Sequence, residues 1–480
     1  MVLSKLAPIG VSCQEYVHPW TSSCSQATCG LYLWALGDAL RVYSTVYILA
    51  LVMKGKIPTL DELKKTIKGI LQSTAFLSVN AFGYSGFLCI LRAVLGHFNV
   101  YTVSGLPAFL ASIFAILIER PSRRLMLALY VSNVATETVW NMLLYRNMVK
   151  SVKNGQVAIF AGSMAILLAV FKAGLHKKDG KSDSMFNIFK FVLGPYEEKD
   201  YNVRSSQSNN ICRQDDQNGD ASSNNGRWPT NNTNNNRKKG NAIYGLIVQA
   251  LKIYKRTVHR IKCCDRHSLC PHPFSCIYYT VQGSAKMFSV GLGLQLALKV
   301  VLNLKTIFRS PQKLGDIVFQ RKNLNIAAFL GGASGLFRMT MCALRRITGK
   351  DDAIHALPAG LIAGLAFFKY PDTTIALYVF WKMLQIMYNL GIDMGFLPKI
   401  PGFTNFLYCL STAILFHAAI VEPTNLRGSY WKFLHSMSGG RIAVMDRKAM
   451  DIWGLDTSES LLKVLGKTKT KAALSWHLVQ

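Results

Sequence analysis

Short apolar words of this chain recur in the same order in its two halves. Five words of the first half return in the second: Ala75-Phe76-Leu77 as Ala328-Phe329-Leu330, Cys89-Ile90-Leu91-Arg92 as Cys342-Ala343-Leu344-Arg345, Leu106-Pro107-Ala108 as Leu357-Pro358-Ala359, Ala128-Leu129-Tyr130-Val131 as Ala376-Leu377-Tyr378-Val379, and Ala165-Ile166-Leu167 as Ala413-Ile414-Leu415. The offset drifts only from 253 to 248 residues, as small loop deletions would produce. A duplicated, mostly apolar unit predicts a membrane protein built from two related helical bundles.

The composition agrees with a membrane protein. Half of the 480 residues are hydrophobic and only 17% are charged, whereas soluble domains carry about 25% charged residues. The apolar residues fall in blocks, and the block 70–91 holds no charged residue. The formal net charge of +30 comes from basic groups beside these blocks. Such placement predicts contact with anionic lipid headgroups rather than nucleic acid, because no nucleic-acid-binding module accompanies the charge.

We therefore predict an all-α, multi-pass integral membrane protein with two related bundles of about five transmembrane helices each, joined by a polar, partly disordered insert. The expected spans are 31–53, 70–91, 99–118, 125–145 and 156–172, then 284–303, 325–344, 354–369, 373–391 and 403–421. The expected divisions are a cysteine-containing N-terminal region at 1–30, the first bundle at 31–175, the insert at 176–282, the second bundle at 283–421 and a basic C-terminal tail at 422–480.

The insert has two parts of different character. Residues 202–239 are rich in Asn and Ser and have almost nothing to bury, which predicts disorder. Within 242–262, apolar residues recur at helical spacing among basic ones. This pattern predicts a basic amphipathic helix, lying either on a membrane surface or against the cytosolic end of the bundle.

Charges inside the expected spans are costly in lipid and therefore informative. Asp38 and Arg41 lie three residues apart on one helical face, where they can neutralise each other. Glu137 has no such neighbour, so we expect it to face the bundle interior or to lie near a helix end and reach the interface. Conceivable partners for Glu137 on other helices are Arg338, Lys286 and Lys299.

Pairs of glycines lie four residues apart in the second half. Gly331 and Gly335 form one pair, and Gly360 and Gly364 form another. This spacing lets helix backbones approach closely, which predicts helix packing. A pore lined by glycine is the alternative reading.

A cluster of cysteine and histidine precedes the second bundle. Its potential metal ligands are Cys263, Cys264, His267, Cys270, His272 and Cys276. Four such ligands can close a tetrahedral zinc site, but free cysteines in a reducing cytosol or palmitoylation beside a membrane helix remain open. Cys13, Cys24 and Cys29 can form a disulfide if the N-terminus faces an oxidising space. We find no catalytic motif, so we expect no enzyme activity and assign no cofactor.

Part of the second half resembles the channel-type subunits of the mitochondrial inner-membrane translocases. The resemblance lies in the charged loop at 345–352, followed by Ala359-Gly360 and Ala363-Gly364 at the start of a helix. It covers about residues 284–391 and lacks the asparagine usual in that loop. The resemblance implies a helical fold more than an activity.

The whole chain resembles the transmembrane protein 135 family more closely. The matching words are Ile70-Leu71-Gln72-Ser73, Cys89-Ile90-Leu91-Arg92, Ala115-Ile116-Leu117-Ile118-Glu119-Arg120, Ser122-Arg123-Arg124, Ala135-Thr136-Glu137-Thr138, Met287-Phe288-Ser289-Val290-Gly291, Ser429-Tyr430-Trp431-Lys432-Phe433-Leu434, Ala443-Val444-Met445 and Arg447-Lys448. Cys13, His18, Trp20 and Cys24 are similar to the cysteine-containing N-terminal region of that family. The family implies a protein of mitochondrial and peroxisomal membranes that promotes mitochondrial fission through a dynamin-related GTPase, organises peroxisomes and is linked to lipid metabolism.

Two other functions remain open from the residues themselves. Duplicated bundles are typical of transporters, so a transporter or a lipid or sterol conduit is the alternative, and a translocase-like subunit is a third. Five spans per copy predict that the second copy is inverted in the membrane, but the distribution of Lys and Arg between the loops favours a parallel arrangement. The orientation of the two copies therefore stays undecided at this point.

Overall fold

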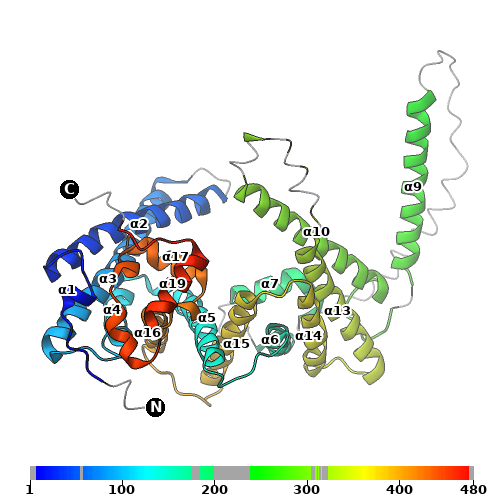
Figure 1. Ribbon diagram of the computed structural model, residues 1–480. Helices are drawn as coiled ribbons and strands as arrows, with labels where there is room; N and C mark the ends of the chain where they lie inside the picture. The colour runs from blue at the N-terminus through cyan, green and yellow to red at the C-terminus, as the bar shows by residue number, and fades with distance from the viewer. Residues whose placement is uncertain are drawn as a thin grey trace, which may run out of the picture. The chain divides into compact units, whose positions relative to one another are not determined.

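The computed structural model describes residues 7–53, 58–175, 183–198, 238–264, 266–303 and 323–474, with five further residues between 309 and 320. These residues are mostly helical (Figure 1). No strand occurs among them, and one antiparallel bridge joins Ile9 to Phe98. The all-α prediction is confirmed.

Six helices in the described ranges are long and apolar enough to cross a membrane. They are α3 (Leu60–Leu95), α6 (Gly155–Lys172), α10 (Cys276–Leu302), α13 (Leu324–Thr348), α15 (Thr373–Asp393) and α16 (Phe403–Val421). This set is compatible with a multi-pass membrane protein, since about 20 apolar residues span a bilayer.

Four of the ten expected spans do not meet this length and hydropathy requirement. They correspond to α2 (Cys24–Met53), α4 (Gly105–Ile118), α5 (Pro121–Tyr145) and α14 (Ala356–Gly364). α4 has 14 residues and α14 has nine before it continues as the 3-10 helix η6 (Leu365–Lys369), so both are short. The two short helices occupy the same place in the two copies of the repeat, since α4 follows α3 and α14 follows α13.

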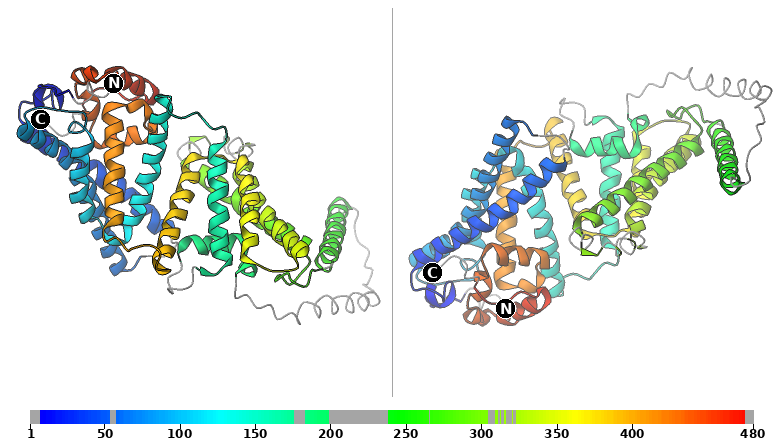
Figure 2. Two further views of the ribbon diagram at one scale, coloured as in Figure 1. Left: turned by 90° about the horizontal axis from the view of Figure 1, so that it is seen from below. Right: turned by 90° about the horizontal axis from the view of Figure 1, so that it is seen from above.

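The chain folds into two compact units. The first unit contains residues 1–152 and 391–480, and the second contains residues 153–390. In the first unit, α3 packs against α2 and α4, and α16 packs against α4 and α5. Figure 2 shows α16 in orange beside α5 in cyan.

The second unit has a corresponding arrangement. In it, α10 packs against α13, α13 packs against α14, and α14 packs against α6. Figures 1 and 2 show α6 between α14 and α15. Each unit therefore holds the first four helices of one repeat copy and the fifth helix of the other. We call α6 and α16 the exchanged helices. The expected bundles, 31–175 and 283–421, assigned α6 to the first unit and α16 to the second, and the structure corrects both assignments.

The second helix of each copy ends in the same way. α3 ends at Gly96 with φ 74°, where the Gly96 N–H donates to the carbonyl of Arg92. α13 ends at Gly349 with φ 64°, and the Gly349 N–H donates to the carbonyl of Arg345. Glycine adopts positive φ without steric cost, so each helix stops three residues after its repeated Cys-x-x-Arg word.

The paired glycines lie where helices approach closely. A Cβ on Gly331 would lie 3.0 Å from Cβ of Phe288 on α10, and one on Gly335 would collide with Oγ of Ser284. A Cβ on Gly360 would lie 2.6 Å from Cα of Ala165 on the exchanged helix α6, and Gly364 meets the Cα of Ala161 in the same way. These contacts are those of helix packing through small residues.

Two glycines of α10 provide a matched test of this packing. A Cβ on Gly291 would lie 2.8 Å from Cα of Ala327, whereas one on Gly293 would meet nothing within 4 Å. Gly291→Ala is therefore expected to destabilise the second unit by about 1–3 kcal/mol through overpacking. Gly293→Ala should be neutral or stabilising by up to about 1 kcal/mol, because alanine favours a helix. Thermal unfolding in detergent micelles measures both, and equal shifts would contradict the packing.

Residues 422–474 are not a tail. They form η7 (Pro423–Asn425), α17 (Gly428–Met437), α18 (Arg441–Val444), η8 (Lys448–Trp453) and α19 (Thr457–Thr468). Trp431 and Trp453 are fully buried and belong to the core of the first unit. The expectation of a basic tail is corrected because these aromatic side chains supply enough apolar surface to fold the segment onto the bundle.

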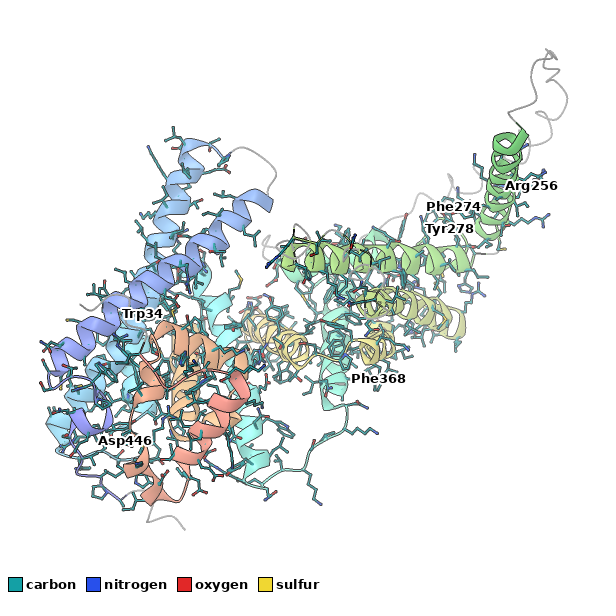
Figure 3. All side chains as sticks on the ribbon, turned by 45° about the horizontal axis from the view of Figure 1, so that its top comes forward. Trp34, Arg256, Phe274, Tyr278, Phe368 and Asp446 are labelled. Carbon is teal, nitrogen blue, oxygen red and sulfur yellow. The ribbon has the colours of Figure 1, made fainter. Side chains whose placement is uncertain are left out.

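The basic segment forms one long helix, α9 (Lys238–Lys262). Its contacts are with α10, and Ile253 and Tyr254 are 64% and 65% exposed. The side chains around its labelled Arg256 project outward in Figure 3. The asparagine-rich stretch 202–237, for which disorder is predicted, lies outside the described residues.

Candidate metal centres and apolar cavity

Three cysteines and one histidine meet in the first unit. The ligand atoms of Cys13, His18, Cys24 and Cys89 all lie within 4.8 Å of one another, and His18 Nε2 is 3.3 Å from Cys24 Sγ. His18 Nδ1 lies 2.8 Å from the carbonyl of Thr21. A carbonyl only accepts, so Nδ1 carries the proton and the Nε2 lone pair of the neutral ring points toward the sulfurs. We call these four residues the first Cys/His cluster.

The second unit contains an equivalent group, the second Cys/His cluster. Cys270, His272, Cys276 and Cys342 are all buried, with ligand atoms within 4.8 Å of one another. Cys270 Sγ is 3.7 Å from Cys276 Sγ, and Cys342 Sγ is 3.4 Å from His272 Nε2. His272 Nδ1 lies 2.6 Å from the carbonyl of Phe274, so the tautomer is again the one with a free Nε2 lone pair.

The two clusters occupy equivalent places in the repeat. Cys89 and Cys342 begin the repeated Cys-x-x-Arg words on the second helix of each copy. Cys24 and Cys276 are the first residues of α2 and α10. Each cluster therefore connects three parts of its copy: the segment before the first helix, the start of that helix (α2 or α10), and the last turns of the next helix (α3 or α13).

Residues 10–144 match the family model of the N-terminal cysteine-rich region of Transmembrane protein 135. The match assigns residues 10–144 to the transmembrane protein 135 family. The matched segment contains all four residues of the first Cys/His cluster. No solved structure matches the chain. The resemblance of the second half to translocase channel subunits stays a prediction.

Arginines follow the last cysteine of both clusters, Arg92 after Cys89 and Arg345 after Cys342. Arg92 donates to the carbonyls of Gly10 and Val11 at 3.0 and 2.9 Å and so holds the segment that leads to Cys13. The contact with the Cys89 thiol, with help from Cys24, His18 and Arg92, lowers the pKa of Cys13 to about 6 despite its partial burial. A low pKa favours the thiolate, which is the form that binds metals.

The second cluster has an arginine within reach of sulfur. Arg346 Nη2 lies 3.6 Å from Cys276 Sγ. The contact with Cys276 raises the pKa of Cys270 to about 11, because the two sulfurs share one proton site and cannot both ionise easily.

Only some of the metal ligands predicted between Cys263 and Cys276 belong to the second Cys/His cluster. Cys270 and Cys276 belong to the second Cys/His cluster, as does His272. Cys264 is exposed and its thiol contacts the carbonyl of Arg260 at 3.2 Å. Cys263 Sγ lies 3.8 Å from His259 Nε2 on α9, and His267 is half-buried outside the cluster.

The N-terminal cysteines are free thiols in the structure, so the disulfide considered for Cys13, Cys24 and Cys29 is not formed. Cys29 is exposed and lies outside the first cluster. Sequence reasoning missed Cys89 and Cys342 as possible ligands. The signal was available, since both are the first residue of a repeated word.

The charges of the expected spans are paired within the first unit. Arg41 Nη2 lies 2.6 Å from Asp38 Oδ1, and the Ser436 hydroxyl donates to the same carboxylate at 2.6 Å. Glu137 pairs with Arg427 and with none of the three partners considered from the sequence. The two side chains neutralise each other.

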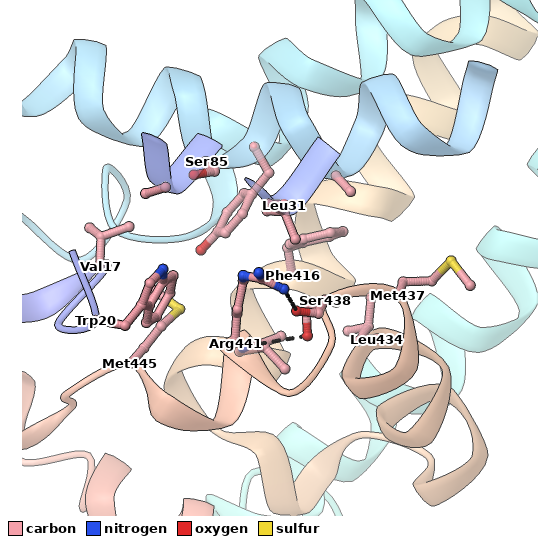
Figure 4. Close-up of a pocket in the computed structure, with 14 residues that line it drawn as sticks. Val17, Trp20, Leu31, Ser85, Phe416, Leu434, Met437, Ser438, Arg441 and Met445 are labelled. Atoms are coloured by element: carbon pink, nitrogen blue, oxygen red, sulfur yellow. Dashed lines mark hydrogen bonds between the residues drawn. The ribbon is translucent and has the colours of Figure 1, made fainter. Parts of the chain in front are cut away.

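Two cavities of the first unit share Ala81, Phe416, Leu434 and Met437 in their walls. The smaller, about 70 Å³, appears in Figure 4, where Arg441 at its wall donates to the Ser438 carbonyl. The larger, about 220 Å³, has mainly aromatic and aliphatic walls. These walls fit the hydrocarbon part of a lipid.

One polar atom in the wall of the larger cavity has no partner. Asn80 is 94% buried, and its Nδ2 donates to the Tyr408 hydroxyl at 3.1 Å. Within the described residues, its Oδ1 accepts no hydrogen bond. A buried acceptor of this kind costs about 1–3 kcal/mol unless a donor is supplied. A ligand with a hydroxyl group would supply one.

A buried ion network contains Arg345, the arginine of the repeated word that begins with the cluster residue Cys342. Arg345 Nη2 lies 2.5 Å from Glu197 Oε2, and both side chains are fully buried. Lys172 Nζ lies 3.8 Å from the same carboxylate and 3.1 Å from Asp351. Burial raises the pKa of Glu197, but the Arg345 guanidinium and Lys172 outweigh it and hold the pKa below its ordinary value.

Proposed function

We propose that the chain is a non-enzymatic, multi-pass protein of mitochondrial and peroxisomal membranes that regulates mitochondrial fission and peroxisome organisation, with a link to lipid metabolism. The match of residues 10–144 to the transmembrane protein 135 family is the observation that carries this proposal. The six apolar helices support the membrane location. The absence of a catalytic motif in the sequence supports a role through contacts rather than chemistry.

The helix α9 is the part of the chain best suited to such contacts. Lys252, Lys255 and Arg256 are exposed beside the exposed Ile253 and Tyr254. Apolar side chains flanked by cations are typical of a helix that lies in the membrane interface. Each cation contributes about 1 kcal/mol near an anionic leaflet. We place α9 on an anionic membrane surface, where it would help to recruit the dynamin-related GTPase of mitochondrial fission.

Charge reversal on α9 tests this role. In the triple variant Lys252→Glu, Lys255→Glu and Arg256→Glu, we expect mitochondria to elongate and co-precipitation of the dynamin-related GTPase to fall, because repulsion lifts the helix from the anionic surface. The matched control, Lys252→Arg, Lys255→Arg and Arg256→Lys, keeps every charge and should behave as wild type. Mitochondrial length and partner recovery unchanged by charge reversal, at equal expression, would refute the role of α9.

The cavity favours a lipid or sterol conduit as the second candidate function. Its apolar walls and the unpartnered Asn80 Oδ1 fit a lipid that carries one hydroxyl group. Ala81→Phe would fill the wall shared by both cavities and should abolish co-purification of such a lipid, measured by mass spectrometry of protein in mild detergent. Ile90→Phe, which adds a ring at an exposed position of the same helix, is the control. A wild-type protein that carries no lipid and gives no flux in liposomes would eliminate this candidate.

A translocase-like subunit is the third candidate. It rests on the sequence resemblance of residues 284–391 alone. Crosslinking of the chain to a precursor protein arrested in transit would support it. A chain that crosslinks to no precursor under conditions where a known translocase subunit does would exclude it.

A further inference from the structure

We propose that each Cys/His cluster binds one Zn²⁺ ion and that the two ions are structural. The proposal is independent of the role in fission, because it concerns only how the chain is held together. Four protein ligands close the coordination shell of zinc, and closed sites of this kind are structural rather than catalytic. Thiolate and imidazole ligands in tetrahedral arrangement select zinc among the common metals.

The distances within the clusters fit a single tetrahedral ion. With Zn–S bonds of about 2.3 Å and Zn–N bonds of about 2.0 Å, two sulfurs lie about 3.8 Å apart and a sulfur and a nitrogen about 3.5 Å apart. Cys270 and Cys276 have their sulfurs 3.7 Å apart. The sulfur–nitrogen distances are 3.3 Å for Cys24 to His18 and 3.4 Å for Cys342 to His272. A polynuclear cluster would need sulfurs much further apart.

Both histidines are oriented as metal ligands are. A ligating imidazole usually donates its other N–H to a carbonyl or carboxylate, which fixes the tautomer and the ring direction. His18 contacts the Thr21 carbonyl and His272 contacts the Phe274 carbonyl, each through Nδ1. In both rings this leaves Nε2 facing the cysteine sulfurs. The same second contact therefore occurs at two sites with different loop sequences.

Disulfide formation does not account for the clusters. One disulfide in a cluster would use two of its three sulfurs and leave a thiol and an imidazole lone pair together in the core. The same set of three cysteines and one histidine is instead kept at equivalent positions of both copies, although the loops that supply it differ in length. From Cys13 to Cys24 the chain passes through α1 (Cys13–Tyr16), whereas Cys270 and Cys276 are six residues apart.

The surroundings balance the charge of the proposed sites. Three thiolates, one neutral imidazole and Zn²⁺ together carry a charge of −1. In the second cluster the Arg346 guanidinium contacts Cys276 Sγ. In the first, the Arg92 guanidinium donates to the carbonyls of Gly10 and Val11, just before Cys13.

The metal content of the full chain tests the proposal. Protein purified in detergent without chelator is expected to hold two zinc ions per chain by inductively coupled plasma mass spectrometry. Cys24→Ser and Cys276→Ser should each lose one ion, and the double variant should lose both. Cys29→Ser and Cys264→Ser remove exposed thiols outside the clusters and should keep both ions.

A conservative exchange keeps the test valid if serine variants fold poorly. His272→Cys creates a set of four cysteines and should retain two ions, whereas His272→Ala should lose one. Refilling the chelated protein with Co²⁺ should give the thiolate-to-cobalt absorption of a tetrahedral site. A metal content at the background of the purification, equal loss in the control variants, or a disulfide between Cys270 and Cys276 in the native protein would each overturn the proposal.

Discussion

Glu197→Gln is expected to destabilise the second unit by about 3–5 kcal/mol, because it removes the anion that a buried guanidinium and a buried ammonium share. Arg345 and Lys172 both contact this carboxylate and are themselves almost inaccessible to water. The Tyr279 hydroxyl also donates to it at 3.1 Å. Glutamine keeps the shape and part of the hydrogen bonding but leaves two positive charges with only the partly exposed Asp351.

The neighbouring residue provides the control. Glu198 is 12% exposed and pairs with the exposed Lys190 at 3.0 Å. Because water can solvate Lys190 when the pair is broken, Glu198→Gln should cost less than Glu197→Gln. Hydrogen–deuterium exchange of the purified protein would locate the effect. We expect faster exchange in α6 and α13 for Glu197→Gln only. Equal exchange in both variants would show that the network contributes nothing to the stability of the unit.

The same carboxylate predicts sensitivity to acid. Its pKa in the folded protein lies below the ordinary value of 4.5. The stabilisation is therefore complete above about pH 4.5 and is lost as the pH falls through the folded-state pKa, because only the unfolded chain binds the proton readily. Unfolding monitored against pH should show this loss in the wild type. If Glu197→Gln shows the same loss of stability at low pH, the loss arises from another titratable group.

Arg447→Met is expected to destabilise the first unit by at least about 3 kcal/mol, because each orphaned buried carbonyl costs about 1–3 kcal/mol. The Arg447 guanidinium donates to the carbonyls of Ala419, Ile420 and Ile442 at 2.9–3.1 Å and lies 5.7 Å from the Trp431 ring centre. Burial lowers its pKa to about 10. Two of these carbonyls are in the last turn of the exchanged helix α16, where no helical N–H reaches them.

The adjacent Lys448 is the matched control for this change. Lys448→Met removes an equivalent charge from an exposed side chain and should alter the melting temperature little. Arg447→Lys restores the charge but not the fork of donors, so it should recover only part of the stability. If Arg447→Met and Lys448→Met melt together, residues 422–474 do not depend on this contact for their attachment to α16.

The helices were accessible to sequence reasoning because apolar blocks and their interruptions are local features. The placement of the exchanged helices was not. α6 and α16 descend from the same repeated segment, as Ala165-Ile166-Leu167 and Ala413-Ile414-Leu415 show, so composition does not tell which set of four helices each one joins. The choice depends on details of fit, such as Ala161 and Ala165 against Gly364 and Gly360.

The candidate sites required contacts between distant residues. Cys276 and Cys342 are 66 positions apart, and no short spacing motif connects them. The pair of Glu137 was missed because its partner, Arg427, lies in the segment expected to be a tail. The basic residues of 422–474 suggested a tail, whereas the buried Trp431 and Trp453 of the same segment fold it onto the bundle. The repeat itself held the missing information, since an arginine and a cysteine recur at the same place in both copies.

The exchange of fifth helices is the central claim about this fold, and site-directed crosslinking tests it most directly. In a chain with Phe160→Cys and Phe367→Cys, the contact of α6 with η6, where the two rings stack 4.2 Å apart, predicts linkage by a short thiol-to-thiol crosslinker, identified by mass spectrometry of the linked peptides. Phe367→Cys with Tyr408→Cys, the position on α16 that corresponds to Phe160, is the pair that would link if each repeat copy kept its own fifth helix. A crosslink in the first pair and none in the second is the predicted result; the reverse would contradict the exchange.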